Sequence, residues 1–523
     1  MFKEKIKAGK TYLGIELGST RIKASIIDDT YKPIASGSYN WENLFKDGYW
    51  TYTLDSVHEG VQKCFKNLAD NVFAQYGIPL KTVGAIGVSA MMHGYMAFDK
   101  YDNLLVPFRT WRNTTTKEAT NILTEVFQFN IPQRWSVAHL YQAILNNESH
   151  VPQIAHITTL AGYVHFLLTG KRELGIGDAS GMFPVCDNNY DSKMLAIFND
   201  LIEDKNYSWD IESILPGIKK AGETGAYLTE DGAKFLDLSG NLQAGIPICP
   251  PEGDAGTGMV ATNSVLPGIG NVSAGTSAFS MLVLKKPLKK FHSQIDIVTT
   301  PDGADVAMIH CNNCCGELDT WVNLFGEFAE LTGNSINKTT LYELLYRNAM
   351  LGDSNGIVTY NYLSGEHITE ISKGRPMYFR VPERKMCLAD FMKAQLYSSI
   401  ATLSIGMDIL FKDEQVTADK FSAHGGLFKV PEVAQQILTD ALKTPVSVTE
   451  TSGEGGAWGM ALLAAYMMNG KNESLGEWLE TKVFSDTKII TLTPIYENTI
   501  EFENYKKRYK DALDAEKKLE EVI

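Results

Sequence analysis

Alternating apolar and polar positions near the start of the chain predict two strands joined by a tight turn. Apolar side chains occupy every second position before and after Gly18, namely Leu13, Ile15 and Leu17, then Ile22, Ala24 and Ile26. A period of two residues is typical of β-strands, whose side chains point alternately to opposite faces. We therefore expect a β-hairpin over residues 11–28, with Gly18 in its turn.

The rest of the pattern alternates helices with strands along the chain. Apolar residues recur at helical spacing in residues 53–78, 117–127, 155–170, 317–332, 388–412, 431–442 and 455–468. Runs typical of strands lie at residues 85–99, 446–449 and 488–492. The last stretch, from Glu503, has the pattern of a charged amphipathic helix, which we expect at the solvated surface. Strands that alternate with helices are typical of α/β domains.

A second strand–turn–strand unit lies near the middle of the chain. Residues 265–284, VLPGIGNVSAGTSAFSMLVL, repeat the pattern of residues 11–28, including a polar Gly/Ser/Thr turn. One such unit at the start of each half indicates two related α/β domains. We place the boundary near residues 255–268, which gives an N-terminal domain of residues 1–262 and a C-terminal domain of residues 263–523.

Composition and charge narrow the possible partners. The formal net charge is −14 over 523 residues, and no long run of Lys or Arg occurs. We therefore expect neither nucleic acid nor a membrane surface as a partner. No segment approaches the roughly 18 uninterrupted apolar residues of a membrane span. The N-terminal residues lack the apolar core of a signal peptide, so we expect a cytoplasmic protein.

The seven cysteines are odd in number and scattered, which does not fit a disulfide framework. Three of them form the cluster Cys311-Asn312-Asn313-Cys314-Cys315. A zinc site needs about four ligands, and no second CxxC or HxxxH pair follows. We therefore expect buried thiols at the start of a helix, with a metal site as the alternative.

Two turns have the composition of phosphate-binding loops. Small residues let the backbone approach phosphate oxygens closely, and amide N–H groups and hydroxyls can then donate to them. An ordinary hairpin turn is the alternative for either segment alone, but one such turn in each half favours phosphate binding. The candidate ligands are Gly18, Ser19, Thr20 and Arg21 in the first turn and Gly275, Thr276 and Ser277 in the second.

Asp254 is the candidate catalytic base. It stands in Gly253-Asp254-Ala255-Gly256-Thr257-Gly258, where small neighbours leave a carboxylate open to a substrate. Phosphoryl transfer needs a group that takes the proton of the attacking hydroxyl. Glu252 is the nearest competitor for this role, and an Asp in a structural Gly-rich turn is the alternative.

Gly425, Gly426 and Glu454 belong to two glycine-rich segments that precede expected helices. Such segments can form a flat slot for a purine, with close helix–strand packing as the alternative. The chain has no GxxxxGK[ST], GxSxG, HExxH or HRD motif, and no GxGxxG placed to suit NAD. These absences argue against P-loop enzymes, Rossmann dehydrogenases, serine hydrolases, zinc proteases and protein kinases.

The order of these motifs resembles the FGGY family of carbohydrate kinases from about Tyr12 to about Lys507. Residues 14–20, GIELGST, are similar to the family hairpin GIDxGT, and Asp254 matches the catalytic carboxylate of GGGDxxxG. Ser273–Ser277 matches SxGTS, and Gly425-Gly426 matches the glycine pair of the adenosine segment. Glu454 opens a segment that resembles ExxAxGA, and residues 178–180 match the DAS motif.

The resemblance implies two ribonuclease H-like α/β domains of the actin-like ATPase type, with a cleft between them. It implies ATP and Mg²⁺ as cofactors, with Glu16, in place of the family Asp, and Asp254 at the metal. Asp254 would also be the catalytic base. ATP would lie mainly against the C-terminal domain and the sugar mainly against the N-terminal one.

The sugar-side motifs resemble the xylulokinase branch. Residues 89–94, SAMMHG, are similar to SGQMHG without its Gln, and residues 111–115, WRNTT, replace the family WxDxR. The expected sugar contacts are Met92, His93, Trp111 and Asp254. We expect a ketopentose such as xylulose as substrate, in a monomer or homodimer. The alternatives are another ketose, a hexonate or a polyol, a catalytically silent sugar-responsive regulator, or an actin- or chaperone-like ATPase.

Overall fold

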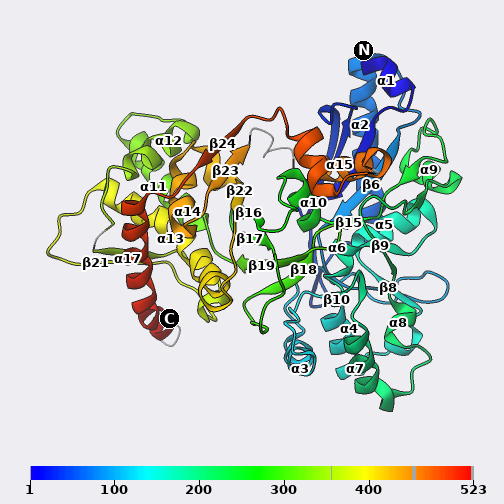
Figure 1. Ribbon diagram of the computed structural model, residues 1–523, viewed down its shortest axis with the longest axis horizontal. Coiled ribbons are helices and arrows are strands. Elements are labelled where there is room, and N and C mark those ends of the chain that lie inside the picture. Colours follow the sequence, from blue (N-terminus) through cyan, green and yellow to red (C-terminus); the bar gives the residue numbers. More distant parts are fainter. Residues whose placement is uncertain (1, 355, 450–454, 471, 520–523) are drawn as a thin grey trace. The chain divides into compact units, whose positions relative to one another are not determined.

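The computed structural model describes residues 2–354, 356–449, 455–470 and 472–519. The chain forms two compact units (Figure 1). Unit 1 consists of residues 1–265, 296–306 and 454–486, and unit 2 of residues 266–295, 307–453 and 487–523. Among the helices of the described residues, none has both the length and the apolar character needed to span a bilayer.

The core of unit 1 is a sheet with the strand order β13-β14-β6-β1-β2-β3. Its centre is the antiparallel pair β1 (Tyr12–Leu17) and β2 (Arg21–Ile27), which confirms the predicted hairpin. β6 (Ala85–Ala90) runs parallel to β1, and β15 (Glu252–Gly253) also pairs with β6. The alternating apolar side chains of the hairpin are fully buried, so this pair anchors the core.

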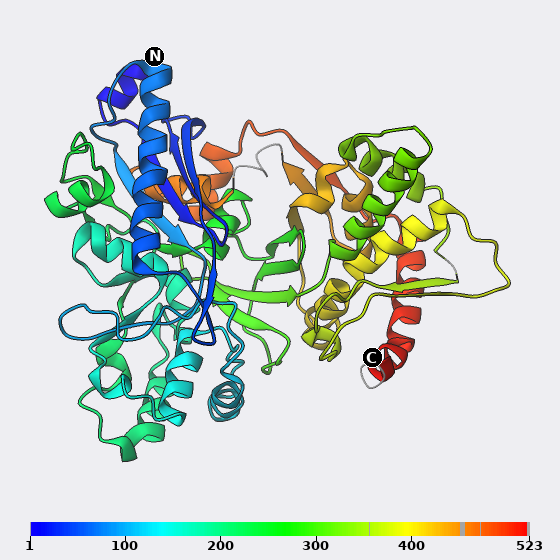
Figure 2. The ribbon, with the colours of Figure 1, turned by 180° about the vertical axis from the view of Figure 1, so that it is seen from behind.

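Helices cover both faces of this sheet. α2 (Leu54–Tyr76) packs on β3 (Pro33–Asn40), as Figure 2 shows, while α15 (Gly456–Asn469) packs on β1, β2 and β6. A Cβ at Gly14 would lie 2.1 Å from the carbonyl oxygen of Ala457, so only glycine allows α15 to cross β1 this closely. The predicted helix over residues 455–468 is therefore present, and it packs in unit 1.

The other elements of unit 1 are mostly short. They are α1 (Phe2–Lys7), β4 (Leu44–Lys46), β5 (Tyr49–Thr51), β7 (Met96–Phe98), α3 (Lys117–Phe127), α4 (Ser136–Leu145), η1 (Val151–Gln153), β8 (His156–Thr158), α5 (Leu160–Thr169), β9 (Glu173–Gly175), α6 (Ile176–Ala179), β10 (Val185–Cys186), β11 (Asn189–Tyr190), α7 (Ser192–Ile202), η2 (Glu203–Lys205), α8 (Ile211–Ile214), β12 (Gly217–Lys219), β13 (Ala226–Tyr227), α9 (Glu230–Leu236), β14 (Pro247–Ile248), α10 (Asp254–Ala261), β18 (Asp296–Thr299), α16 (Leu475–Trp478) and η6 (Leu479–Val483).

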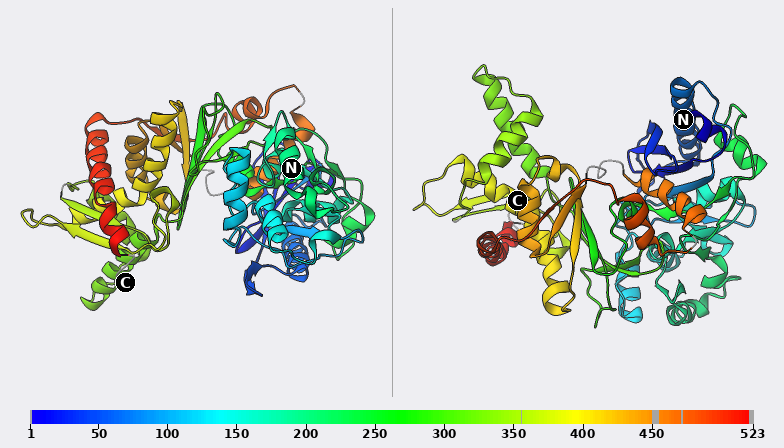
Figure 3. Two further views of the ribbon diagram at one scale, coloured as in Figure 1. Left: turned by 90° about the horizontal axis from the view of Figure 1, so that it is seen from below. Right: turned by 45° about the horizontal axis from the view of Figure 1, so that its top comes forward.

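Unit 2 has its own sheet, in which β19, β17, β16, β22, β23 and β24 follow one another in that order. β16 (Ile269–Ala274) and β17 (Ala278–Val283) form the second predicted hairpin, and β22 (Lys420–His424) runs parallel to β16. The helices α13 (Leu388–Asp408) and α14 (Val433–Leu442) pack on each other, and α17 packs on both (Figure 3).

The other elements of unit 2 are β19 (Asp305–Cys311), α11 (Gly316–Leu331), α12 (Lys338–Ala349), β20 (Ile357–Tyr360), η3 (His367–Thr369), β21 (Met377–Arg380), η4 (Ile409–Asp413), η5 (Gly426–Lys429), β23 (Val446–Thr449), β24 (Ile489–Leu492), α17 (Tyr496–Asp511) and α18 (Leu513–Leu519).

Two predicted helices differ from the observed ones. The predicted helix 155–170 begins instead with β8, and α5 starts only at Leu160, where Thr159 caps it by accepting from the N–H of Gly162. The C-terminal helix α17 starts at Tyr496, before Glu503, and buries Phe502, Tyr505 and Tyr509. One side of it therefore belongs to the core of unit 2, and the predicted solvated surface is limited to the other side, where Lys507 and Lys510 are exposed.

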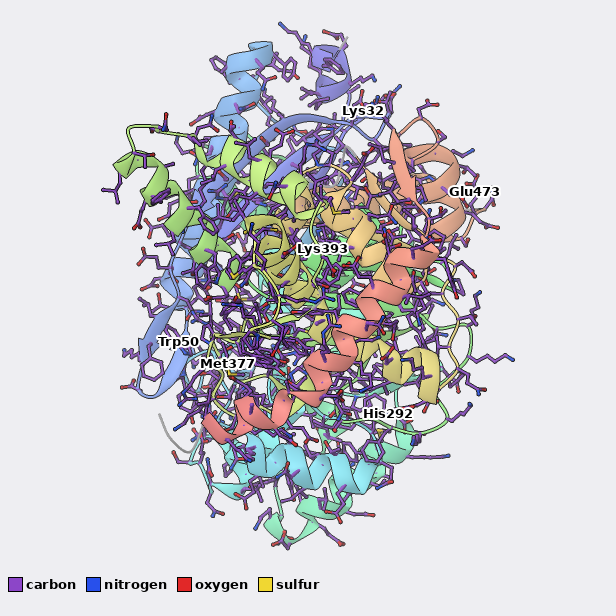
Figure 4. The ribbon with its side chains drawn as sticks, turned by 90° about the vertical axis from the view of Figure 1, so that its left-hand side faces the viewer. Lys32, Trp50, His292, Met377, Lys393 and Glu473 are labelled. Carbon is purple, nitrogen blue, oxygen red and sulfur yellow. The ribbon has the colours of Figure 1, made fainter. Side chains whose placement is uncertain are left out.

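Lys393 on α13 (labelled in Figure 4) shows how this side of α17 is held. Its side chain is 9% exposed, and its Nζ donates to Oε2 of Glu501 on α17 over 2.6 Å. A buried ammonium group needs such a partner, because a charge removed from water without one is costly.

Candidate functional site

Glu16 and Lys23 face each other across the first hairpin of unit 1. Glu16 on β1 is the register partner of Lys23 on β2. Burial raises the pKa of the Glu16 carboxyl group to about 7, and the negative charge of Asp254 contributes to the rise, while Lys23 opposes it. The two predicted metal ligands, Glu16 and Asp254, are therefore close enough for the charge of Asp254 to raise the pKa of Glu16.

Asp254 is the first residue of α10, where helix geometry favours a negative charge. Its Oδ1 accepts a hydrogen bond from the N–H of Met92 over 3.1 Å. The surrounding protein raises the pKa of this carboxyl group, and the N–H groups of Met92 and Ala255 oppose the rise. The residue is nevertheless exposed to solvent, which leaves the carboxylate within reach of a substrate.

The start of α15 closes one side of this carboxylate pair. A Cβ at Gly456 would lie 1.6 Å from Oε2 of Glu16 and 2.8 Å from Oγ1 of Thr257. Only glycine leaves room for the Glu16 carboxylate at this helix N-terminus. Glu454, predicted to contact the nucleotide, lies outside the described residues.

Two acidic side chains suit Mg²⁺, which takes one or two protein carboxylates and completes its shell with water and phosphate oxygens. Glu16 and Asp254 supply this donor set, and their mutual repulsion adds to the rise in the pKa of Glu16 that burial mainly causes. A divalent cation would relieve this repulsion, so the residues present fit the ion. No group of three or more His, Cys, Asp or Glu side chains suited to a metal occurs among the described residues.

The predicted sugar contacts Met92 and His93 lie in the loop after β6. His93 has a φ of 71°, which is uncommon for a residue other than glycine. Its Nδ1 is 3.1 Å from the carbonyl oxygen of Gly181, which fixes the ring with a proton on Nδ1. A Cβ at Gly181 would lie 2.6 Å from both this nitrogen and Cε of Met92, so glycine is needed there.

Two buried carboxyl groups, those of Glu252 and Asp178, lie near Asp254, whose negative charge acts on Asp178. Glu252 accepts from the N–H of Asp178 over 3.0 Å, and Asp178 accepts from the hydroxyl of Thr159 over 2.6 Å. Burial raises the pKa of Asp178 to about 7 and that of Glu252 well above its usual range. Glu252 is 2% exposed, so it is far less accessible than Asp254, its rival for the role of base.

Trp111 and Asn113 lie beside the first turn and the β4–β5 hairpin. The Nε1 of Trp111, an exposed side chain, donates to Oγ of Ser19 over 3.2 Å. Asn113 is buried, and its amide pairs with both backbone groups of Trp50 (labelled in Figure 4), at 2.8 Å from the N–H and 2.9 Å from the carbonyl oxygen. Asn113 therefore holds the hairpin.

The first turn, Gly18–Thr20, is held through its carbonyl oxygens. Trp41 donates from Nε1 to the carbonyl of Gly18 over 2.7 Å, and Tyr52 donates from its hydroxyl to the carbonyl of Ser19 over 2.5 Å. The side chain of Arg21, also predicted as a phosphate ligand, donates to Asn40 over 2.9 Å. Nothing in the sequence pattern marks Trp41 and Tyr52 as anchors of this turn.

The second turn, Ser273–Ser277, is held by backbone groups of the cysteine cluster. The N–H groups of Cys314 and Cys315 donate to the carbonyl oxygens of Thr276 and Gly275, each over 2.9 Å. All three thiols of the cluster are buried, and Cys315 precedes the first residue of α11. The expected buried thiols at a helix start are present, and their backbone supports the turn.

Asparagine side chains fix the cysteine cluster in turn. Asn361 donates from Nδ2 to the carbonyl of Cys314 over 2.7 Å. Asn313 accepts at Oδ1 from the N–H groups of Leu363 and Ser364, over 2.9 and 3.0 Å. Both asparagines are buried, so these hydrogen bonds are shielded from water.

Gly425 and Gly426 lie next to the second turn. Because Ser273 on β16 pairs with His424 on β22, Gly425 follows at the same edge of the sheet. A Cβ at Gly425 would lie 2.3 Å from the carbonyl oxygen of Ala274, whereas one at Gly426 would meet no atom within 4 Å. Some predicted nucleotide-binding residues lie outside the first turn, and unit 2 brings the described ones together: Gly275, Thr276, Ser277, Gly425 and Gly426.

Comparisons with known proteins identify the family of the chain. The FGGY family of carbohydrate kinases matches with its N-terminal domain over residues 11–261 and its C-terminal domain over residues 270–468. A xylulose kinase from Staphylococcus xylosus is 21% identical over 531 residues, covering 96% of this chain and 99% of that protein.

Solved structures share the fold. A ligand-bound xylulose kinase and a gluconate kinase, both from Lactobacillus acidophilus, match with TM-scores of 0.78 and 0.77 and 16% identity. Each match covers 97% of this chain and 98% of the other. The predicted α/β fold of the actin-like ATPase type is confirmed. The chain belongs to the FGGY family of carbohydrate kinases, and it is a phosphotransferase that acts on a sugar or related alcohol.

Proposed function

We propose that this kinase transfers the γ-phosphoryl group of ATP to a hydroxyl of a ketopentose such as xylulose. The observation that carries the proposal is Asp254, a solvent-accessible carboxylate held by the N–H of Met92, next to His93 in the loop expected to contact the sugar. The similarity to a xylulose kinase over 96% of the chain supports the choice of sugar.

In the proposed reaction Asp254 accepts the proton of the attacking hydroxyl. The hydroxyl oxygen forms a bond to the γ-phosphorus, and the bond to the leaving oxygen of ADP breaks. Asp254 can act as this base because its carboxylate is accessible, and such a base contributes ~10²–10⁴ in rate. Met92, His93 and Trp111 would contact the sugar. The turns at Gly18–Arg21 and Ser273–Ser277 would donate to phosphate oxygens, and Gly425 and Gly426 would lie against the purine.

Glu16 and Asp254 are the residues that would hold Mg²⁺. The ion supplies neutralisation of the charge on the β- and γ-phosphates. Lys23 faces Glu16, and its positive charge opposes the rise in the pKa of the Glu16 carboxyl group that burial and Asp254 cause. The predicted cleft between two domains divided near residue 262 stays a prediction, as does the choice between monomer and homodimer.

A sugar acid, another ketose or a polyol is the second candidate for the acceptor. Asn113 occupies the place of the family acid in the WxDxR segment. Its amide oxygen accepts from the N–H of Trp50, and its amide nitrogen donates to the carbonyl oxygen of Trp50. A side chain with all its hydrogen bonds satisfied is a poor reader of a sugar hydroxyl, so this position favours an acceptor different from that of typical xylulokinases.

The test is ADP release from Mg·ATP over a panel of ketopentoses, other ketoses, hexonates and polyols. We expect a strong response to one ketopentose and a much weaker one to its epimers. A response to a hexonate alone would keep the kinase and replace the acceptor. ATP binding without turnover of any acceptor would favour a sugar-responsive regulator.

A further inference from the structure

Trp41 and Tyr52 hold the first turn from one side. They are 7% and 1% exposed, and their rings stack with centroids 4.1 Å apart. Three consecutive carbonyl oxygens of the turn accept hydrogen bonds from this pair, those of Gly18 and Ser19 from the side chains and that of Thr20 from the N–H of Trp41 over 3.2 Å.

The direction of these carbonyl groups also fixes the direction in which the N–H groups of Ser19 and Thr20 point. In a trans peptide the C=O and the following N–H point in opposite directions, and no cis peptide occurs in the described residues. When the carbonyls of Gly18 and Ser19 point toward Trp41 and Tyr52, the N–H groups of Ser19 and Thr20 point away from them. Neither N–H donates to another residue in the described part of the chain.

We propose that Trp41 and Tyr52 are positioning residues that aim the N–H groups of Ser19 and Thr20 at a phosphate of ATP. Successive N–H groups turned to one side form a concave site for an anion. The inference deepens the proposed function and rests on it. It also gives a role to the segment at residues 41–52, which contains both side chains but none of the predicted site residues.

The test uses substitutions that delete one donor and keep an aromatic side chain. Tyr52→Phe removes only the hydroxyl, and Trp41→Phe removes Nε1. Matched controls are Tyr76→Phe, whose hydroxyl donates to the carbonyl of Ile34 over 2.7 Å, and Trp209→Phe, whose Nε1 donates to the carbonyl of Val151 over 3.0 Å. Both controls lie in unit 1 and remove the same kind of hydrogen bond.

Isothermal titration of the full-length protein would compare a non-hydrolysable ATP analogue with Mg²⁺ and adenosine alone. Loss of one such hydrogen bond predicts ~3- to 10-fold weaker binding of the analogue by Tyr52→Phe and by Trp41→Phe. Adenosine has no phosphate, so its affinity should not change. The two controls should bind both ligands like the unaltered protein, and melting temperatures would show how far each pair differs in stability.

The outcomes separate the inference from the proposed function. The positioning role would be overturned if Tyr52→Phe bound the analogue as tightly as Tyr76→Phe, and Trp41→Phe as tightly as Trp209→Phe. The kinase assignment would still stand. A parallel loss of adenosine and analogue affinity would also overturn it, because the effect would then be general. If the unaltered protein binds no analogue, the proposed function fails, and the inference fails with it.

Discussion

The two turns that we predict to bind phosphate are the same kind of segment, yet they are held by different parts of the chain. Side chains of Trp41 and Tyr52 hold the carbonyls of the first turn, whereas backbone N–H groups of Cys314 and Cys315 hold those of the second. The first turn also follows the strand that carries Glu16, which is coupled to Asp254. Composition alone thus identifies a turn, but its support and its chemistry depend on distant residues.

The largest effect should come from removing Asp254, the proposed base, which lies in the same unit as the first turn. Asp254→Asn keeps the size of the side chain but cannot accept the hydroxyl proton, so we expect kcat to fall by ~10²–10⁴. The affinity for ATP measured without Mg²⁺ should change little, because the turns and glycines are unaltered and only the proposed metal ligand is lost. Steady-state kinetics and nucleotide titration check both parts. Turnover close to that of the unaltered enzyme would remove Asp254 as the base.

A second, smaller loss should follow from displacing Glu16 without changing it. In Gly456→Ala the new Cβ would collide with Oε2 of Glu16 and crowd Thr257, so the carboxylate must move. A shift of about 1 Å can cost ~10² in rate, and we expect this loss with a higher Mg²⁺ requirement. The control is Gly258→Ala, where a Cβ meets no atom within 4 Å. Equal activity of the two variants would show that turnover does not depend on the present position of the Glu16 carboxylate.

Support of the second turn can be weakened only indirectly, through a side chain that holds the cysteine backbone. Asn361→Ala removes the donor to the carbonyl of Cys314, which leaves a buried acceptor unpaired at a cost of about 1–3 kcal/mol. We expect several-fold weaker ATP binding with an unchanged KM for the sugar.

Asn498→Ala is the matched control for this variant. Asn498 donates to Oδ2 of Asp440 over 3.1 Å and lies on α17 of unit 2, which contains none of the predicted nucleotide-binding residues. Chemical denaturation would measure the stability of both variants. If the two asparagine variants lose ATP affinity to the same extent, the second turn does not depend on Asn361.

The smallest expected effect is a pH dependence that belongs to the surroundings of the first turn. The folded pKa of Glu16 is about 7, above its unfolded value of roughly 4.3. Between these values the folded state binds more protons than the unfolded one, so stability should fall as pH rises from about 5 to 7. A full proton corresponds to about 1.4 kcal/mol per pH unit as an upper limit.

Thermal melts of the protein and of Glu16→Gln, from pH 5 to pH 8 and without nucleotide, test this dependence. Gln stays uncharged, so the variant should gain stability relative to the unaltered protein as pH rises. A constant difference over this range would contradict the raised pKa of Glu16.

The sequence predicts those parts of the molecule that depend on neighbouring residues. Period-two apolar positions locate both hairpins, and the glycines around Asp254 mark an accessible carboxylate. The packing of α15 against Gly14 and the pairing of Glu16 with Gly456 could not be predicted, because they join residues more than 400 positions apart. The burial of Tyr505 and Tyr509 on α17 was missed for a related reason, since charged neighbours hide the apolar side of that helix.

The hydrogen bonds of Asn113 constrain any attempt to redesign the acceptor site. Exchange to Asp, the residue that the family often has there, would keep the acceptor for the N–H of Trp50 but lose the donor to its carbonyl and to that of Thr110. A carboxylate would then face two carbonyl oxygens, which repel it. The hairpin would loosen before the new acid could serve a sugar, so this position and residues 49–51 have to be exchanged together.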